Sequence, residues 1–288
     1  MSTKKLKIDL HCHTHYSDGA LSVPELLMRS QQMQVDVLAI TDHDCIDALA
    51  PARQYLKEVK QKLTLINGVE ISTKWHGFEI HIIGLDFDHQ SLKLQDRLLS
   101  QQQKRRERAQ KISDKLANIG IENVYEQCTQ MTKDSCISRG HIAKLLVQKG
   151  HVSHFQQAFT QYLGKNKKAY VSPNWISISE AIEWIHDAGG VAVIAHPYHY
   201  DMTTKWLRRL LNDFSQAGGD GLEVQHPSLS LQKHELMLAL ANEYSLAGSA
   251  GSDFHLPTRW TELGRRLDFT DSTTAIWTKF KQTSLPTH

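Results

Sequence analysis

The chain has 288 residues, of which 40% are hydrophobic, and its formal net charge is +2. This length allows one large α/β domain or a core domain with an insertion, and the small net charge alone does not indicate a nucleic-acid-binding protein. No apolar run approaches the ~20 residues that span a bilayer, and no signal-peptide segment opens the chain, so we expect a cytoplasmic protein.

Histidine is the unusual component of the composition, with 17 residues. It is the commonest metal ligand and the general acid or base of neutral pH. The four cysteines form no Cys-x-x-Cys pair and no dense disulfide pattern, so we expect reduced, buried thiols. The positions of the histidines therefore indicate the chemistry.

The first predicted element is a short apolar strand at Ile8, which runs into a polar loop that ends at Gly19. Side chains alternate along a strand, so His11 and His13 point to the same face and can chelate one ion. Asp18 adds an oxygen ligand from the loop. The alternative is a solvated, histidine-rich N-terminus, but similar residues follow later strands.

Helices and strands then alternate until the fourth strand. The predicted segments are helix 23–34, strand 35–40, helix 46–60, strand 63–69 and strand 79–85. Such alternation predicts a parallel sheet, most simply closed as a barrel.

The alternation stops over residues 93–173, where helical patterns predict an α-helical insertion. These helices are expected at 101–116, 140–148 and 155–163. The basic residues between Lys104 and Lys115 form either a solvated helix face, which we favour, or an RNA-binding track. Alternation then resumes with helix 179–188, strand 191–195, helix 203–217, strand 221–224, helix 229–244 and a last strand before Gly251.

Residues of metal-ligand type follow nearly every predicted strand, and only His81 lies inside one. The residues at strand ends are His11, His13, Asp42, His43, Glu70, His196, His226, Asp253 and His255. Active sites of β/α barrels lie at the C-terminal ends of the strands. The sequence therefore predicts a polynuclear metal site on one rim.

The motifs, in chain order, resemble the polymerase and histidinol phosphatase (PHP) superfamily. They are His11-x-His13 with Ser17-Asp18-Gly19, Thr41-Asp42-His43-Asp44, Gly68-Val69-Glu70, Glu79-Ile80-His81, Ala195-His196-Pro197 and Gly251-Ser252-Asp253-x-His255. Ile137-Ser138-Arg139-Gly140-His141 and Lys167-x-x-Tyr170-Val171 add a closer resemblance within the superfamily. They are similar to the bacterial branch of 3′,5′-nucleotide bisphosphate phosphatases and RNase AM, a 5′-to-3′ exoribonuclease. The resemblance implies a distorted seven-stranded (β/α) barrel from residues 1–92 and 174–288, with 93–173 as an α-helical substrate-binding cap.

The resemblance also implies up to three metal ions. The ligand sets would be His11, His13, Glu70 and Asp253 for the first ion, Glu70, His81 and His196 for the second, and Asp18, His43 and His255 for the third. Many relatives have histidine where Asp18 stands, so the third site has more oxygen character here. Imidazole and carboxylate ligands without thiolate fit Mn²⁺, Fe²⁺ or Zn²⁺, and we favour Mn²⁺.

Substrate residues are expected mainly in the insertion. Arg139 and His141 stand at a predicted helix start, where a guanidinium and helix amides favour phosphate, and Lys167 and Tyr170 belong to the same resemblance. The alternative is a capping segment with solvated charges.

The donor of a proton to the leaving group stays open among three residues. They are Asp42, His141 and His226. Asp42 either takes part in catalysis or orients a metal-ligating imidazole. His226 either contacts phosphate or packs beside the site.

These expectations describe a metal-dependent phosphoesterase. It would hydrolyse nucleoside 3′,5′-bisphosphates, trim 5′-monophosphorylated RNA ends from 5′ to 3′, or do both. The alternatives are a histidinol-phosphate-type phosphatase and a non-catalytic or proofreading PHP module. We expect a monomer that binds a nucleotide or short RNA 5′ end, and neither a membrane nor stable DNA.

Overall fold

Seven strands form a nearly closed barrel in the part of the chain that the computed structural model describes, residues 6–132, 136–267 and 272–285. In order around the barrel they are β1 (Ile8–Asp9), β2 (Val37–Ile40), β3 (Thr64–Trp75), β4 (Phe78–Leu85), β6 (Val191–Ile194), β7 (Gly221–Gln225) and β8 (Ala247–Ala250). The two edge strands of the sheet, β1 and β8, meet through residues at their ends and just after them. There Leu10 N–H donates to the Ala250 carbonyl (3.0 Å) and His13 N–H donates to the Phe254 carbonyl (2.8 Å). The predicted distorted seven-stranded barrel is confirmed.

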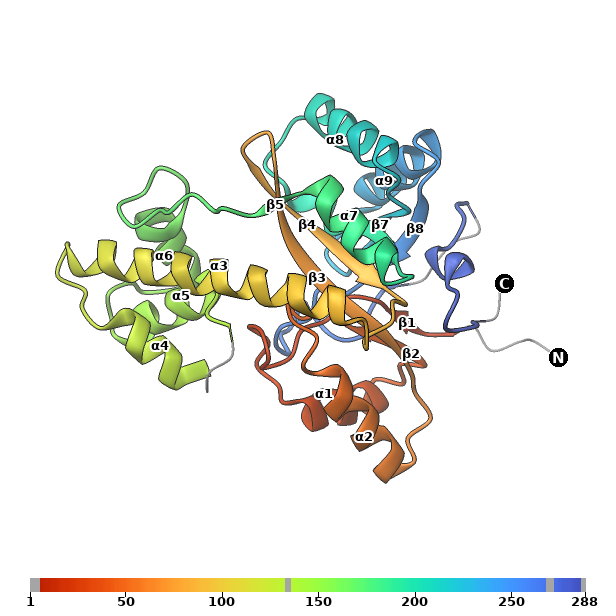
Figure 1. The fold of residues 1–288 in the computed structure, drawn as a ribbon, viewed down its shortest axis with the longest axis horizontal. Helices are drawn as coiled ribbons and strands as arrows, with labels where there is room; N and C mark the ends of the chain where they lie inside the picture. Colours follow the sequence, from red (N-terminus) through yellow and green to blue (C-terminus); the bar gives the residue numbers. More distant parts are fainter. Residues whose placement is uncertain (1–5, 133–135, 268–271, 286–288) are drawn as a thin grey trace.

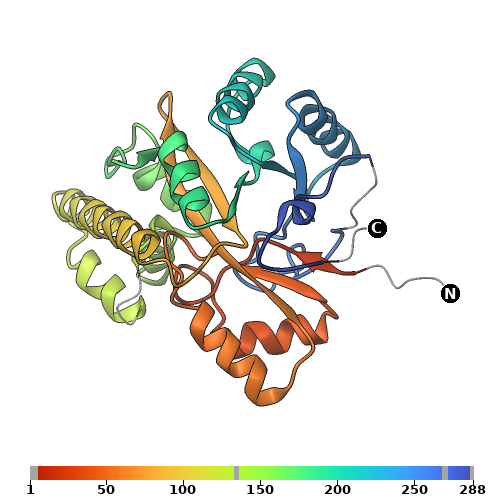
Figure 2. The ribbon, with the colours of Figure 1, turned by 45° about the vertical axis from the view of Figure 1, so that its right-hand side comes forward.

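Helices surround the barrel strands (Figures 1 and 2). They are α1 (Val23–Gln32), α2 (Leu49–Val59), α7 (Ile178–Asp187), α8 (Thr204–Gln216) and α9 (Leu231–Glu243). α8 shows why such segments fold this way. Its buried residues Leu207, Leu210, Leu211 and Phe214 recur at helical spacing, and Thr203 caps the first turn. No helix among the described residues has the length and apolar character needed to cross a membrane.

β4 runs antiparallel to both of its neighbours, so the prediction of a parallel sheet is wrong at this strand. A two-residue turn replaces the crossover helix between β3 and β4: His76 and Gly77 both have positive φ, 43° and 80°. The start of β4 therefore lies at the rim where the parallel strands end. This explains how His81, inside its strand, reaches the same rim as the other candidate ligands.

Glu70 lies within β3 and not at its end as predicted, because the strand continues to Trp75. The additional residues pair with β4 and carry a short strand, β5 (Ile176–Ser177), which pairs parallel to β3 at Thr73 and Lys74. This extension of β3 and β4 forms the wall against which the insertion packs.

The segment between β4 and β5 is helical, with its own hydrophobic core. It contains α3 (Leu92–Ala117), α4 (Val124–Thr132), α5 (Arg139–Gln148), α6 (Phe155–Ala158) and a π-helical turn (Phe159–Leu163). α3 begins earlier than predicted and projects from the barrel, and α4, α5 and α6 gather around its far half (Figure 1). Leu94 and Leu98 pack in the hydrophobic layer between the barrel strands and their surrounding helices, whereas Ile112 and Leu116 pack in the core of the insertion. We keep residues 93–173 as a proposed cap unit.

Candidate metal centre

The end of β1 places two imidazoles against each other. The Nε2 atoms of His11 and His13 lie 3.1 Å apart, and both side chains are fully buried. Cys12, between them, points away and donates its thiol to the Ala39 carbonyl at 3.2 Å. The alternation predicted for this strand is therefore present.

Glu70 lies at the centre of the cluster. Its Oε2 atom is 3.3 Å from His13 Nε2 and 2.9 Å from His43 Nδ1. Its Oε1 atom is 2.8 Å from His81 Nδ1 and 3.0 Å from His196 Nε2. Each carboxylate oxygen thus faces a different group of imidazoles, which is the arrangement of a bridging ligand.

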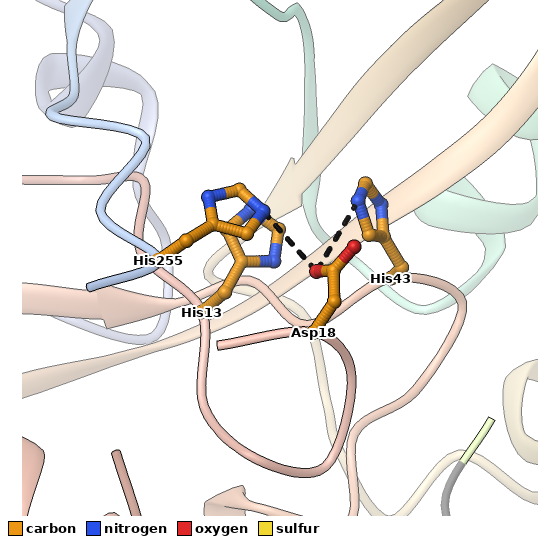
Figure 3. A group of neighbouring side chains, drawn as sticks. All are labelled: His13, Asp18, His43 and His255. Carbon is orange, nitrogen blue, oxygen red and sulfur yellow. Dashed lines mark ion pairs between the residues drawn. The ribbon is translucent and has the colours of Figure 1, made fainter. Parts of the chain in front are cut away.

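Asp18 belongs to a second group of donors with His13, His43 and His255 (Figure 3). Its Oδ1 atom lies 3.1 Å from His255 Nε2 and 3.8 Å from His43 Nε2. The loop that carries it folds back onto His13, because a Cβ at Gly19 would lie 2.4 Å from the His13 carbonyl oxygen. Only glycine permits this close approach.

Two candidate ligands have strained backbones. Asp253 has φ 50° and His196 has φ 29°, which is the left-handed region. Such residues cost of order 1–3 kcal/mol and cluster at functional sites. The strain at Asp253 brings its Oδ1 atom to 3.3 Å from both His11 Nε2 and His13 Nε2.

Buried polar atoms of the cluster lie close to other ligand atoms, yet among the described residues they have no hydrogen-bond partner of suitable geometry, as expected of a donor set that fits metal ions. They are Asp18 Oδ1, His43 Nδ1 and Glu70 Oε2. Burying such atoms is costly unless something coordinates them. Three groups of ligand atoms, each within 4.8 Å of one another, converge here, and all use imidazole nitrogen or carboxylate oxygen. This chemistry suits a divalent transition metal.

The carboxylates of the cluster and the imidazole of His13 have shifted pKa values. Burial opposes ionisation of Glu70, but His43 and His81 hold its pKa well below the usual range. His43 and His255 outweigh burial in the same way at Asp18, so its pKa is also well below the usual range. Burial lowers the pKa of His13 to about 3, so its imidazole is neutral at pH 7. The ionised carboxylates and the neutral His13 are therefore in the forms that bind metal. At His255, by contrast, Asp18 and Asp253 outweigh burial and raise the pKa to about 10, so this imidazole has to release a proton before it can bind a cation.

Two buried carboxylates behind the cluster were missed by the sequence analysis. Glu223 on β7 lies 2.9 Å from His11 Nδ1 and accepts the backbone N–H of His196 at 2.5 Å. Asp9 on β1 accepts the backbone N–H groups of Ser252 and Gly264 at 2.9 and 2.8 Å. Their only signal in the sequence is an acidic residue within an apolar strand.

Asp42 holds the loop that follows β1. Its carboxylate accepts hydrogen bonds from Thr14 N–H (2.7 Å), Thr14 Oγ1 (2.7 Å) and Ser17 Oγ (2.6 Å). Ser17 Oγ lies 3.3 Å from His13 Nδ1. Of the two roles predicted for Asp42, these contacts favour orientation of an imidazole, that of His13.

A cavity of about 610 Å³ lies between the metal-ligand rim and the insertion. Asp18, His43, His81 and His255 line one end, and Arg108, Arg139, Lys144, Phe155 and Phe159 are among the residues that line the rest. The cavity therefore joins the candidate metal cluster to cationic and aromatic side chains.

Glu79 organises the cationic wall. It forms a bidentate pair with Arg108 (3.0 and 2.9 Å) and a single contact with Arg139 (3.1 Å). Arg105 similarly pairs with Asp44 at 2.5 Å. Arg105 and Arg108 are buried, so the favoured interpretation of this basic stretch as a solvated face is wrong for them.

The other predicted substrate residues do not line the cavity. His141 accepts Ser138 N–H in a capping box, and burial lowers its pKa to about 4. Lys167 is exposed, and the Tyr170 carbonyl accepts a hydrogen bond from Lys115. His226 Nδ1 lies 2.8 Å from Ser228 Oγ, with its ring beside Tyr198.

Known proteins resemble the chain over most of its length. A 5′-3′ exoribonuclease of Haemophilus influenzae is 47% identical, with 95% of this chain and 99% of that protein covered. A 3′,5′-nucleoside bisphosphate phosphatase of Chromobacterium violaceum is 39% identical, with 87% of each covered. A solved structure described as an amidohydrolase from Chromobacterium violaceum, with bound sulfate and no metal, has a TM-score of 0.88 at 37% identity and covers 95% of both chains. The PHP domain model matches residues 9–181, and the chain belongs to this family.

Proposed function

We propose that this chain is a metal-dependent phosphoesterase that acts on a nucleotide with a 5′-phosphate and cleaves the phosphoester at its 3′ side. The observation that carries this proposal is one shared cavity, which is lined at one end by the candidate ligands Asp18, His43, His81 and His255 and elsewhere by Arg139. The named activities of the relatives support it.

The two named activities have one substrate feature in common. A nucleoside 3′,5′-bisphosphate and the first nucleotide of a 5′-phosphorylated RNA both carry a 5′-phosphate and a 3′-phosphoryl group. Cleavage at the 3′ side releases inorganic phosphate from the first compound and a nucleotide from the second. One site can therefore serve both reactions. The 3′-phosphoryl group carries no further substituent in the bisphosphate, whereas it carries the rest of the chain in RNA.

The proposed metal ligands are those assigned from the motifs. They are His11, His13, Asp18, His43, Glu70, His81, His196, Asp253 and His255. Divalent ions held there would lower the pKa of a water molecule and neutralise charge on the reacting phosphoryl group. We propose Mn²⁺, with up to three ions per chain, and Fe²⁺ or Zn²⁺ as the other candidates.

Arg139 is proposed to bind the phosphate that does not react. It stands at the first position of α5, and the N-terminus of a helix favours an anion. Its side chain is 29% exposed, and it lines the cavity. A fixed guanidinium orients the substrate so that only the 3′-phosphoryl group reaches the cluster.

A phosphatase for a small monoester is the alternative function. The cavity volume of about 610 Å³ and its aromatic and cationic wall favour the larger, doubly phosphorylated substrate.

The test is a comparison of turnover on adenosine 3′,5′-bisphosphate, a 5′-monophosphorylated RNA and histidinol phosphate. We expect hydrolysis of the first two, loss of activity in chelator, and recovery with Mn²⁺. Elemental analysis should find two to three transition-metal ions per chain. Full activity in chelator, or a preference for histidinol phosphate, would contradict the proposal.

A further inference from the structure

The cavity wall away from the metal cluster is aromatic. Phe155 and Phe159 both line it, with ring centroids 5.4 Å apart and planes inclined by 50°. Phe159 packs partly against the core of the insertion, whereas Phe155 is 45% exposed. Core packing therefore does not explain Phe155, and the two rings offer an apolar surface to whatever enters the cavity.

This aromatic surface comes close to the metal cluster at the start of α5. A Cβ placed on Gly140 would lie 3.3 Å from Asp18 Oδ2 and 3.9 Å from Phe155 Cζ. The carboxylate and the ring edge are therefore separated by little more than this first turn. A ligand that places one group at the cluster therefore has its other atoms next to Phe155.

The cationic wall meets the same rings. The guanidinium carbon of Arg139 lies 5.9 Å from the centroid of the Phe159 ring, and the guanidinium also contacts Glu79. A phosphate on Arg139 would thus lie next to a flat apolar surface. Phe159 is also the first residue of the π-helical turn, and such turns occur frequently at functional sites.

We infer that Phe155 and Phe159 form a stacking platform for the base of the 5′-terminal nucleotide. This inference rests on the proposed function. A base is the flat apolar part of that substrate, and it is joined through one ribose to both phosphates. Stacking on aromatic side chains contributes affinity for any base, because every base has a π face.

The test compares adenosine 3′,5′-bisphosphate with its abasic analogue, 1-deoxyribose 3,5-bisphosphate, in the full-length metal-loaded protein. Phe155→Ala should raise KM for the nucleotide about 5- to 150-fold, the loss expected for one stacking ring. The kcat for the nucleotide should change less than threefold, and both kcat and KM for the abasic analogue should change less than twofold. Phe155→Tyr should restore KM because it retains an aromatic ring.

Trp260→Ala is the matched control, since Trp260 is 71% exposed and lies outside the cavity lining. A direct measurement uses 2-aminopurine riboside 3′,5′-bisphosphate, whose fluorescence is quenched by stacking. If the wild type quenches this fluorescence and Phe155→Ala does not, the result supports the platform. Equal losses on both substrates, or unchanged quenching in Phe155→Ala, overturn it. Hydrolysis of neither substrate by the wild type would instead refute the proposed function.

Discussion

Glu223 fixes the imidazole of His11, because its carboxylate lies 2.9 Å from Nδ1 and leaves Nε2 to face the cluster. Carboxylates in this position set the tautomer and raise the basicity of a ligating histidine. Glu223→Gln should therefore weaken metal binding about 10- to 100-fold while the barrel remains folded. Titration of Mn²⁺ against a competing chelator measures the affinity.

The control for this variant is Glu235→Gln, an exposed position on α9. It should bind metal as the wild type does. Unchanged affinity in Glu223→Gln would show that the contact with His11 has no effect on the metal site.

Glu70→Gln should lower turnover at least 100-fold. The substitution preserves the shape of the side chain but removes the negative charge that five neighbouring imidazoles surround. Kinetics with adenosine 3′,5′-bisphosphate, metal analysis and a thermal melt of the same preparation test the prediction. Near wild-type turnover at normal metal content would be incompatible with a bridging role.

The pairs around Glu79 predict a pH dependence of stability. Burial would raise its pKa, but Arg139 and Arg108 lower it from 4.5 to about 2. A carboxylate with a lowered folded-state pKa stabilises the protein fully above about pH 4.5, and this contribution disappears as the pH falls toward 2. The shift corresponds to about 3 kcal/mol at most.

Urea unfolding of chelator-treated protein at pH 5 and pH 3 measures this contribution. The free energy of unfolding should fall more steeply for the wild type than for Glu79→Gln, which has no carboxylate to protonate. Parallel losses in both proteins would mean that the ion pairs between β4 and the insertion do not stabilise the fold.

Two sequence patterns, the alternation of side chains along a strand and the alternation of helices with strands, predicted most of the residues that converge on one rim. His11 and His13 share a face because side chains alternate, and His196 and Asp253 follow strands that run in parallel. These patterns did not explain how His81, which lies inside its strand, reaches this rim, because nothing in the sequence of β4 shows that it runs antiparallel. Its direction depends on the turn at His76 and Gly77.

Contacts between the barrel and the insertion could not be predicted from local sequence. Arg105 and Arg108 are one helical turn apart on a polar helix, a pattern that also fits a solvated face. Their burial depends on the angle at which α3 leaves the barrel and on the partners Asp44 and Glu79. Glu223 was missed for a related reason, because its role appears only when β7 lies beside His11 in space.

Arg139 is the residue through which the insertion would select a substrate. One contact joins it to Glu79 at 3.1 Å, whereas Arg108 is held by two bonds to Glu79 and one to the Val171 carbonyl. Arg108 is thus more firmly fixed, and Arg139 has the greater freedom to contact a ligand in the cavity.

Arg139→Ala should therefore reduce kcat/KM on adenosine 3′,5′-bisphosphate about 10- to 150-fold, the cost of roughly 1.5–3 kcal/mol for a charge-assisted contact. On p-nitrophenyl phosphate, which has no second phosphate, the loss should nearly vanish, because the metal ligands are untouched. Arg106→Ala, an exposed position on α3, serves as the control and should change neither substrate. If Arg139 acts only structurally, both substrates should lose activity in parallel and the Tm should fall. That result would remove the main support for recognition of a second phosphate by the insertion.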